Sequence, residues 1–138
     1  MTYYCTLEPD DGKYAVSFPD LPNVLTYGDT KEEALYNAWE ALNGVLESEL
    51  SSGGSLPEEP KAGPREGLFP VAVEPHVAVA YQLRRLRGSE SQSEVARRLG
   101  ITYQAYQRLE NPVKGNPSVK TLERVARALG KKLEVTIG

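Results

Sequence analysis

The segment QSEVARRLGITYQAYQRLEN, residues 92–111, constrains the fold most, because it has the pattern of two short helices joined by a tight turn. Its inward apolar positions fall only where two crossing helices touch: Val95, Ala96, Leu99, Tyr106 and Leu109. Gly100 stands at the break, where a helix end favours a residue that tolerates positive φ. Ile101 then points inward, and Thr102 is a good N-cap for the second helix. The segment therefore predicts a helix-turn-helix motif.

The outward face of the second helix carries side chains that can reach base edges and phosphates in a major groove. Gln92, at the start of the first helix, and two residues of the following loop are expected to meet the DNA backbone. The complete set of expected DNA-binding residues is Gln92, Thr102, Tyr103, Gln104, Gln107, Arg108, Lys114 and Asn116. This pattern predicts sequence-specific binding of double-stranded DNA by a homodimer.

The formal charge divides the chain into two opposite halves. Residues 76–138 contain 12 Lys and Arg against 5 Asp and Glu, a net charge of about +7. Residues 1–75 contain 4 against 14, a net charge of about −10, and the two halves together give the overall charge of −3. Such asymmetry is typical of a nucleic-acid-binding half joined to an acidic half with another partner.

The acidic half predicts an α+β layer pair with the order β-β-β-α-β. Two strands at residues 3–8 and 13–18 flank strong turn chemistry at residues 9–12. Residues 19–23 are expected to end the second strand, and a short third strand follows at residues 24–27. Thr30 and Glu33 form a capping box for a helix over Lys31–Leu50. Its inward residues are expected to be Leu35, Ala38, Trp39, Leu42, Val45, Leu46 and Leu50. A fourth strand follows at residues 68–73, where Pro70 indicates a sheet edge.

We expect two domains, residues 1–75 and residues 76–138, with a flexible Pro/Gly/Ser/Glu-rich insertion at residues 51–67. The second domain is expected to be all-α, with a first helix that turns Val79, Leu83 and Leu86 inward. Its arginines are expected to face outward: Arg84, Arg85 and Arg87. A last helix begins after Ser118 and ends at Gly130. Residues 132–137 alternate like a short C-terminal strand. Such a strand can be disordered, join the sheet of the first domain or pair with its copy in a dimer, and we expect the last.

A family resemblance adds to this reading. Phe18-Pro19-Asp20-Leu21-Pro22 and the stretch from Gly28-Asp29-Thr30 to Asn37-Ala38 resemble the signature of HicB antitoxins, and residues 91–130 resemble a Cro/repressor-type helix-turn-helix. The resemblance implies a partial ribonuclease-H-like domain that neutralises a small HicA-type mRNA-cleaving toxin. It also implies repression of the chain's own operon. The residues expected to contact the toxin are Phe18, Asp20, Leu21, Tyr27 and Asp29.

An enzymatic function is not expected, because the acidic residues in the first half each suit a turn, a chain break or a helix start. His76 has no Cys or His partner in sequence, so neither a metal site nor a cofactor is predicted. Cys5 is the only cysteine, and Met1 is followed directly by a strand pattern, which together favour a cytoplasmic protein without a signal peptide. Two alternatives remain open: a ligand-sensing repressor with an apolar pocket under Trp39, and a DNA-guided metal nuclease that uses Asp20.

Overall fold

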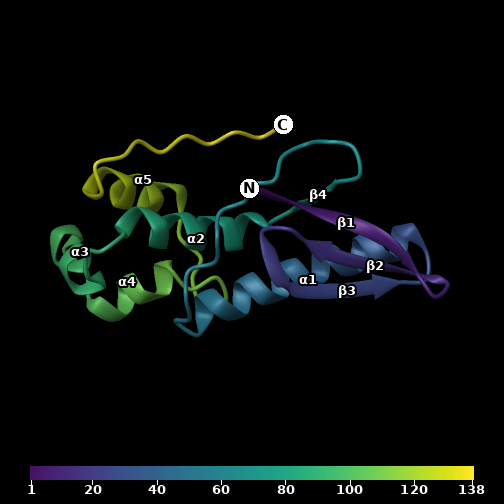
Figure 1. Cartoon of the computed structure of the whole chain (residues 1–138). Coiled ribbons are helices and arrows are strands. Elements are labelled where there is room, and N and C mark those ends of the chain that lie inside the picture. The colour runs from purple at the N-terminus through teal and green to yellow at the C-terminus, as the bar shows by residue number, and fades with distance from the viewer. The chain divides into compact units, whose positions relative to one another are not determined.

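The computed structural model describes all residues, 1–138, and divides them into two units, Met1–Ala78 and Val79–Gly138. In the first unit, strands β1 (Thr2–Asp10), β2 (Lys13–Phe18), β3 (Leu21–Gly28) and β4 (Phe69–Ala72) form one antiparallel sheet of order β3-β2-β1-β4. Helix α1 (Lys31–Ser51) packs along one face of this sheet (Figure 1). The predicted β-β-β-α-β order is confirmed.

Turn chemistry sets the register of the first hairpin. Asp11 and Gly12 both have positive φ, 50° and 79°, which matches the twist of the two-residue turns that favour β-hairpins. The strands therefore pair from Asp10 opposite Lys13 to Thr6 opposite Ser17. The buried face of the sheet carries Tyr3, Cys5 and Val16, and burial raises the pKa of the Cys5 thiol to about 11.

The second hairpin is tighter than predicted. Only Pro19 and Asp20 separate the paired residues Phe18 and Leu21, so β3 begins at Leu21 rather than at residue 24. The predicted break at residues 19–23 is wrong in its second half. Pro22 is tolerated in a strand because β3 lies at the sheet edge, where a missing N–H removes no ladder hydrogen bond.

Helix α1 begins as predicted, with the Thr30 hydroxyl accepting a hydrogen bond from the Glu33 amide at 3.1 Å. Its buried stripe differs from the predicted one, because Ala34 and Asn43 are buried in addition, whereas Leu35 and Val45 are only partly buried and Trp39 is exposed. Ala34 is fully buried because β3 ends directly against the helix at this point. The approach is so close that a Cβ added to Gly28 would lie 2.3 Å from the Ala34 nitrogen. Trp39 was expected inward, but it lies at the surface beside Tyr36 and is 36% exposed. A Trp39 side chain at the surface does not cover the apolar pocket that the ligand-sensing alternative requires.

The segment between α1 and β4 contains no helix or strand, yet it is held to the first unit. The Asp20 carboxylate accepts hydrogen bonds from the Lys61 and Ala62 amides at 2.7 and 2.8 Å, and the Tyr3 hydroxyl donates to the Glu58 carbonyl. Asn43, buried on α1, donates to the Ala72 carbonyl and accepts from the Glu74 amide. The return of the chain as edge strand β4, predicted from Pro70, is confirmed.

The second unit is helical, with α2 (Pro75–Arg87) entering from the first unit and α3 (Gln92–Leu99), α4 (Tyr103–Leu109) and α5 (Val119–Ala128) following. The expected C-terminal strand is not formed within this single chain: residues 131–138 belong to no helix or strand. A lone strand has no neighbour to satisfy its backbone groups, which is the physical reason for this difference. None of the helices combines the length and hydropathy of a membrane-spanning segment.

Candidate nucleic-acid interface

The geometry of the α3–α4 turn is fixed by three local devices. The Ser91 hydroxyl caps α3 by accepting from the Glu94 amide at 3.0 Å. Gly100 ends that helix in the left-handed region, with φ of 70°, and the Ile101 amide donates back to the Ala96 carbonyl at 3.1 Å. The Thr102 hydroxyl then caps α4 by accepting from the Ala105 amide at 3.1 Å. The predicted helix-turn-helix is therefore present, with its caps in the predicted places.

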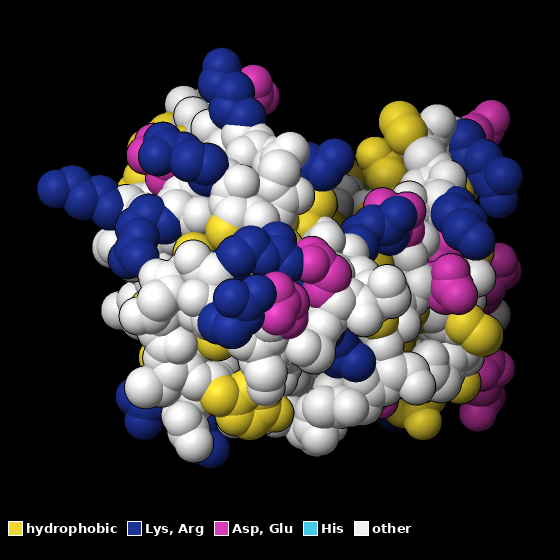
Figure 2. Space-filling model, turned by 90° about the vertical axis from the view of Figure 1, so that its left-hand side faces the viewer, with side chains coloured by type: hydrophobic (Ala, Val, Ile, Leu, Met, Phe, Trp, Pro, Cys, Tyr) yellow, Lys and Arg dark blue, Asp and Glu magenta, His cyan; other side chains and the backbone are white.

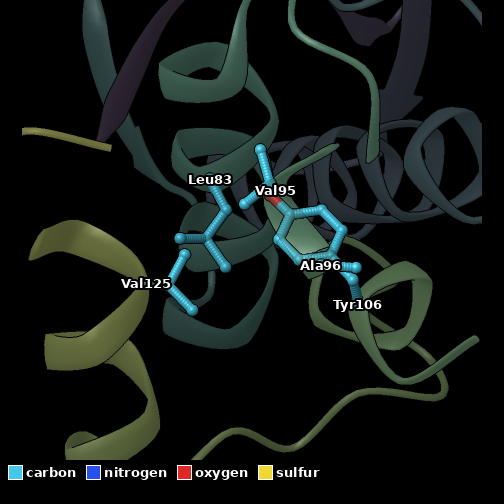
Figure 3. Packing of buried hydrophobic residues seen from close by; sticks show 5 residues of the cluster. All are labelled: Leu83, Val95, Ala96, Tyr106 and Val125. Atoms are coloured by element: carbon cyan, nitrogen blue, oxygen red, sulfur yellow. The ribbon is translucent and has the colours of Figure 1, made fainter. Parts of the chain in front are cut away.

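A small core holds the four helices of this unit together. Figure 3 shows Leu83 of α2, Val95 and Ala96 of α3, Tyr106 of α4 and Val125 of α5 pointing toward one another. Partly buried residues complete this core: Val79, Leu99, Ile101, Leu109, Leu122 and Leu129. Because Ala96 is small and only 2% exposed, α3 and α4 approach closely, and the outer face of α4 is presented at a fixed angle.

That outer face carries the side chains predicted to read bases. Gln104, Gln107 and Arg108 are exposed, and Tyr103 is 42% exposed. The Tyr103 hydroxyl accepts a hydrogen bond from the Gln107 amide at 2.9 Å, which restrains both side chains on one side of the helix. A glutamine pairs well with adenine, and an arginine with guanine or a phosphate. The structure brings these four residues together on one surface.

The loop after α4 places two further predicted residues beside it. The Asn111 side chain accepts hydrogen bonds from the Val113 and Lys114 amides at 2.9 and 3.0 Å and so fixes a local turn. Lys114 is exposed in this turn. Gly115 lies so close to α4 that an added Cβ would be 2.0 Å from the Arg108 carbonyl oxygen. Asn116 follows it and is exposed.

The positive charge of this unit is only partly available to a nucleic acid. Arg97 and Arg127 form ion pairs with Glu94 and Glu123 on their own helices. Arg98 forms an ion pair with Glu90, and Arg98 and Arg124 also donate to the carbonyls of Ala128 and Leu99, respectively, which ties α3 to α5. The exposed lysines and arginine that make no ion pair near α4 are Arg108, Lys114 and Lys120. Figure 2 views the molecule from the side on which α3, α4 and α5 lie in Figure 1, and shows Lys and Arg side chains protruding there, several of them beside Asp or Glu.

The side chains of Gln92 and Thr102 both make hydrogen bonds within the second unit. The Gln92 amide donates to the Glu110 carboxylate at 3.1 Å, and Gln92 is half-buried. The Thr102 hydroxyl accepts the capping bond described above, so its own proton remains available to a phosphate oxygen. The sequence placed both residues at helix starts but did not show that Gln92 has an internal partner.

The sequence reasoning missed a buried ion pair at the centre of this unit. Arg87 was expected outward, but it is turned inward and donates two hydrogen bonds to the Glu110 carboxylate at 2.7 and 3.0 Å. The pair is 15% and 4% exposed at its side chains, and the hydrogen bond to Glu110 raises the pKa of Arg87. Two partners 23 positions apart leave no periodic signal in sequence. Because Gln92 joins the same carboxylate, the pair connects α2 and α3 to the end of α4.

Tyr106 is the one buried polar side chain of this core without a hydrogen bond. Its hydroxyl is fully enclosed near Arg87 and Glu110 but has no partner in bonding geometry. Burial, with the neighbouring Glu110 carboxylate, raises the pKa of Tyr106 well above its usual range. An aromatic residue in this place fills the core volume but brings an unsatisfied oxygen with it.

In the first unit the expected toxin-contact residues separate into two groups. Phe18 and Leu21 are buried, 1% and 6% exposed, so their side chains are core residues and unavailable to a partner in this conformation. Asp20 holds the chain at Lys61 and Ala62, as described above. Tyr27, which is 62% exposed, and Asp29, whose side chain is exposed and pairs with Lys13 at 3.9 Å, remain accessible.

Three acidic residues considered for nuclease chemistry have local structural roles instead. Asp11 forms the first turn, Asp20 holds backbone amides, and Asp29 precedes the cap of α1. No three side chains of His, Cys, Asp or Glu lie together in a way that could hold a metal ion.

The capped α3–α4 turn and the exposed face of α4 identify the second unit as a helix-turn-helix DNA-binding domain. The chain is therefore a helix-turn-helix DNA-binding protein with a separate N-terminal α+β unit. Residues 83–135 match the helix-turn-helix family, and residues 2–76 match the HicB-like antitoxins of bacterial toxin-antitoxin systems. The chain belongs to the HicB-like antitoxin family.

Full-length relatives agree with this assignment. Antitoxin HicB 1 of Photorhabdus laumondii is 34% identical over 99% of this chain and 87% of its own length. Antitoxin HicB of Escherichia coli K12 is 30% identical over 99% of both chains. Among solved structures, the antitoxin HicB of Burkholderia pseudomallei is similar with a TM-score of 0.47 and 21% identity, over 77% of this chain and 90% of that chain.

Proposed function

We propose that this chain neutralises a small basic RNA-cleaving toxin and represses the operon that encodes it, acting in the cytoplasm. The observation that carries the proposal is the combination, in one chain, of a HicB-like unit and a helix-turn-helix unit with an exposed reading face. The opposite charges of the two halves support it, since about −10 suits a cationic toxin and about +7 suits DNA.

Repression requires a specific site, and one α4 helix reads only a few base pairs. We therefore propose that the chain binds a near-palindromic operator as a homodimer, with half-site centres about 34 Å apart or a multiple of that distance. Gln104 and Gln107 are proposed to read base edges together with Tyr103. The phosphate contacts are assigned to Arg108, Lys114, Asn116 and the helix starts at Gln92 and Thr102.

The DNA-reading role is tested by replacing Gln104 with alanine in the full chain. Gln104→Ala is expected to weaken binding to the operator by about 1–3 kcal/mol and to leave binding to random DNA almost unchanged. Gln82→Ala, a change of the same kind at an exposed position of α2, is the matched control and should alter neither affinity. Equal losses on operator and random DNA for Gln104→Ala would show that this residue does not read a base.

The toxin-binding role is tested with the toxin encoded beside this chain, purified away from it, and a labelled mRNA. Full-length protein is expected to stop RNA cleavage near equimolar concentration. We expect a fragment of residues 1–78 to do the same; it extends past residue 75 because Val77 is fully buried. Undiminished cleavage at a several-fold excess of the full-length chain at low salt would refute the proposal.

A further inference from the structure

The core of the second unit contains one buried side-chain oxygen that no hydrogen bond satisfies, the Tyr106 hydroxyl. The side chain is fully buried, and its ring points into the core among apolar residues (Figure 3). A buried hydroxyl without a partner is costly, and phenylalanine would fill nearly the same volume without that cost. Any partner for this oxygen must come from the polar side chains beside it.

The neighbouring acceptor is the Glu110 carboxylate. Glu110 follows Tyr106 by four residues, a spacing that places two side chains on the same face of a helix. The carboxylate is itself buried and already accepts three hydrogen bonds. Two come from Arg87 at 2.7 and 3.0 Å, and the third comes from the Gln92 amide at 3.1 Å. With these donors in place, the Tyr106 hydroxyl has no bond to the carboxylate.

The donors differ in how easily they can leave. Arg87 is buried with the carboxylate, so breaking its two bonds would leave both charges unpaired in the core. Gln92 is neutral and half-buried in the first turn of α3, so its amide can turn to the surface while Glu110 keeps its arginine partner. The same amide is assigned above to a DNA phosphate. A phosphate on that nitrogen would lie close to the carboxylate, and because the two anions repel each other, the amide serves one of them at a time.

Resting on the proposed function, we infer that Gln92 and Tyr106 exchange places at Glu110 when DNA binds. In the free protein the Gln92 amide donates to the carboxylate and the Tyr106 hydroxyl is unbonded. On DNA, the Gln92 amide donates to a phosphate oxygen, and the Tyr106 hydroxyl donates to the carboxylate oxygen that Gln92 has left. The bond that Glu110 loses is thereby replaced within the core. Tyr106 is a positioning residue for DNA binding and touches no DNA itself.

The first experiment measures the affinity of full-length variants by fluorescence anisotropy on two labelled duplexes. One duplex carries the sequence upstream of the chain's own gene, and the other is a random sequence of the same length. Tyr106→Phe is expected to bind both about 5- to 10-fold more weakly, the equivalent of one net hydrogen bond, although it raises the melting temperature. Tyr3→Phe removes a buried hydroxyl from the first unit and is the matched control, expected to leave both affinities unchanged.

The opposite signs of the two effects distinguish the exchange from a purely structural role. A hydroxyl that mattered only for packing would change stability and DNA affinity in the same direction. A Tyr106→Phe protein that binds both duplexes within two-fold of wild type would overturn the inference. Wild-type protein that prefers the upstream duplex no more than the random one would refute the proposed repression instead. The random duplex would still report on the exchange, because a phosphate contact needs no particular sequence.

The second experiment is a double-mutant cycle with Gln92. Gln92→Ala vacates the carboxylate, so the Tyr106 hydroxyl is expected to be bonded to Glu110 even without DNA. In that background Tyr106→Phe should lower the melting temperature instead of raising it, and it should no longer weaken DNA binding. Gln82→Ala, at an exposed position of α2, is the control background, in which Tyr106→Phe should act as it does in wild type. Additive effects of Gln92→Ala and Tyr106→Phe on both quantities would overturn the exchange.

The third experiment observes the hydroxyl itself by NMR, in full-length protein labelled with ¹³C at the tyrosine Cζ atoms. This carbon responds to the hydrogen bonding of the attached oxygen, and the Tyr106 resonance is assigned by its loss in Tyr106→Phe. Adding the random duplex is expected to shift this resonance in wild type. In Gln92→Ala the resonance should be displaced before any DNA is added. A Tyr106 resonance that does not move when wild-type protein is saturated with DNA would overturn the inference.

Discussion

Removing the positive partner of the buried ion pair should be far more damaging than a typical surface substitution. Arg87→Met would leave the Glu110 carboxylate, 4% exposed, with only the Gln92 amide as a partner. Breaking a buried pair on one side costs about 3–5 kcal/mol, because the remaining charge stays desolvated. A unit of about 60 residues has roughly 3–9 kcal/mol of stability at 0.05–0.15 kcal/mol per residue. The substitution is therefore expected to remove much of the stability of the second unit.

Urea denaturation of the full-length chain measures this loss. Far-UV circular dichroism follows the helices of both units, including α3, α4 and α5 of the second, while fluorescence of Trp39, the only tryptophan, follows the first unit alone. We expect the helical transition of Arg87→Met to move to lower urea, and the Trp39 transition to move much less. Operator binding should fall with the helical signal.

The double variant Arg87→Met/Glu110→Leu isolates the reason. It removes both charges, and an apolar pair of similar volume is often as stable as the ion pair that it replaces. We expect it to recover most of the stability lost by Arg87→Met. A loss below about 1 kcal/mol for Arg87→Met, or a double variant no more stable than the single one, would refute the reasoning from desolvation.

Three further predictions concern the same unit. Tyr106→Phe removes the unbonded hydroxyl and should raise stability by about 1 kcal/mol in thermal unfolding; a lower melting temperature would show that the hydroxyl has a partner such as water. Gly115→Ala places a Cβ against the Arg108 carbonyl and should cost about 1–3 kcal/mol, whereas Gly63→Ala, which meets nothing within 4 Å, should be near neutral. Removal of Leu133–Gly138 should weaken the homodimer in analytical ultracentrifugation, and a truncated chain still dimeric below micromolar concentration would exclude that segment as the main contact.

The elements of this fold could be predicted because their signals are local. Thr30, Ser91, Thr102 and Ser118 each cap a helix through a hydrogen bond to the amide three residues later, and a three-residue spacing is visible in any sequence. The Asp11–Gly12 turn is equally local. The outward face of α4 followed from the same periodicity, so the exposure of Tyr103, Gln104, Gln107 and Arg108 was predicted correctly.

What could not be predicted depends on pairs distant in sequence. The inward turn of Arg87 requires Glu110, and the role of Asp20 requires the amides of Lys61 and Ala62. Trp39 was assigned to the core because periodicity alone does not tell which side of a wide apolar stripe meets the sheet. The burial of Phe18 and Leu21 similarly follows from a hairpin with a two-residue turn. This turn pairs the two residues directly and places both side chains in the core.

The hydrogen bonds of Asp20 also bear on how the chain would survive a cut by a protease. The connection from α1 to β4, about 17 residues long, is pinned near its middle, so the exposed stretches on either side are short. A cut between Ala62 and Leu68 would sever the covalent link to the helix-turn-helix unit. The four residue pairs between β1 and β4, together with the hydrogen bonds of Asn43 to Ala72 and Glu74, would then hold the two fragments together. The lifetime of these few contacts would set how long a nicked molecule still behaves as one protein.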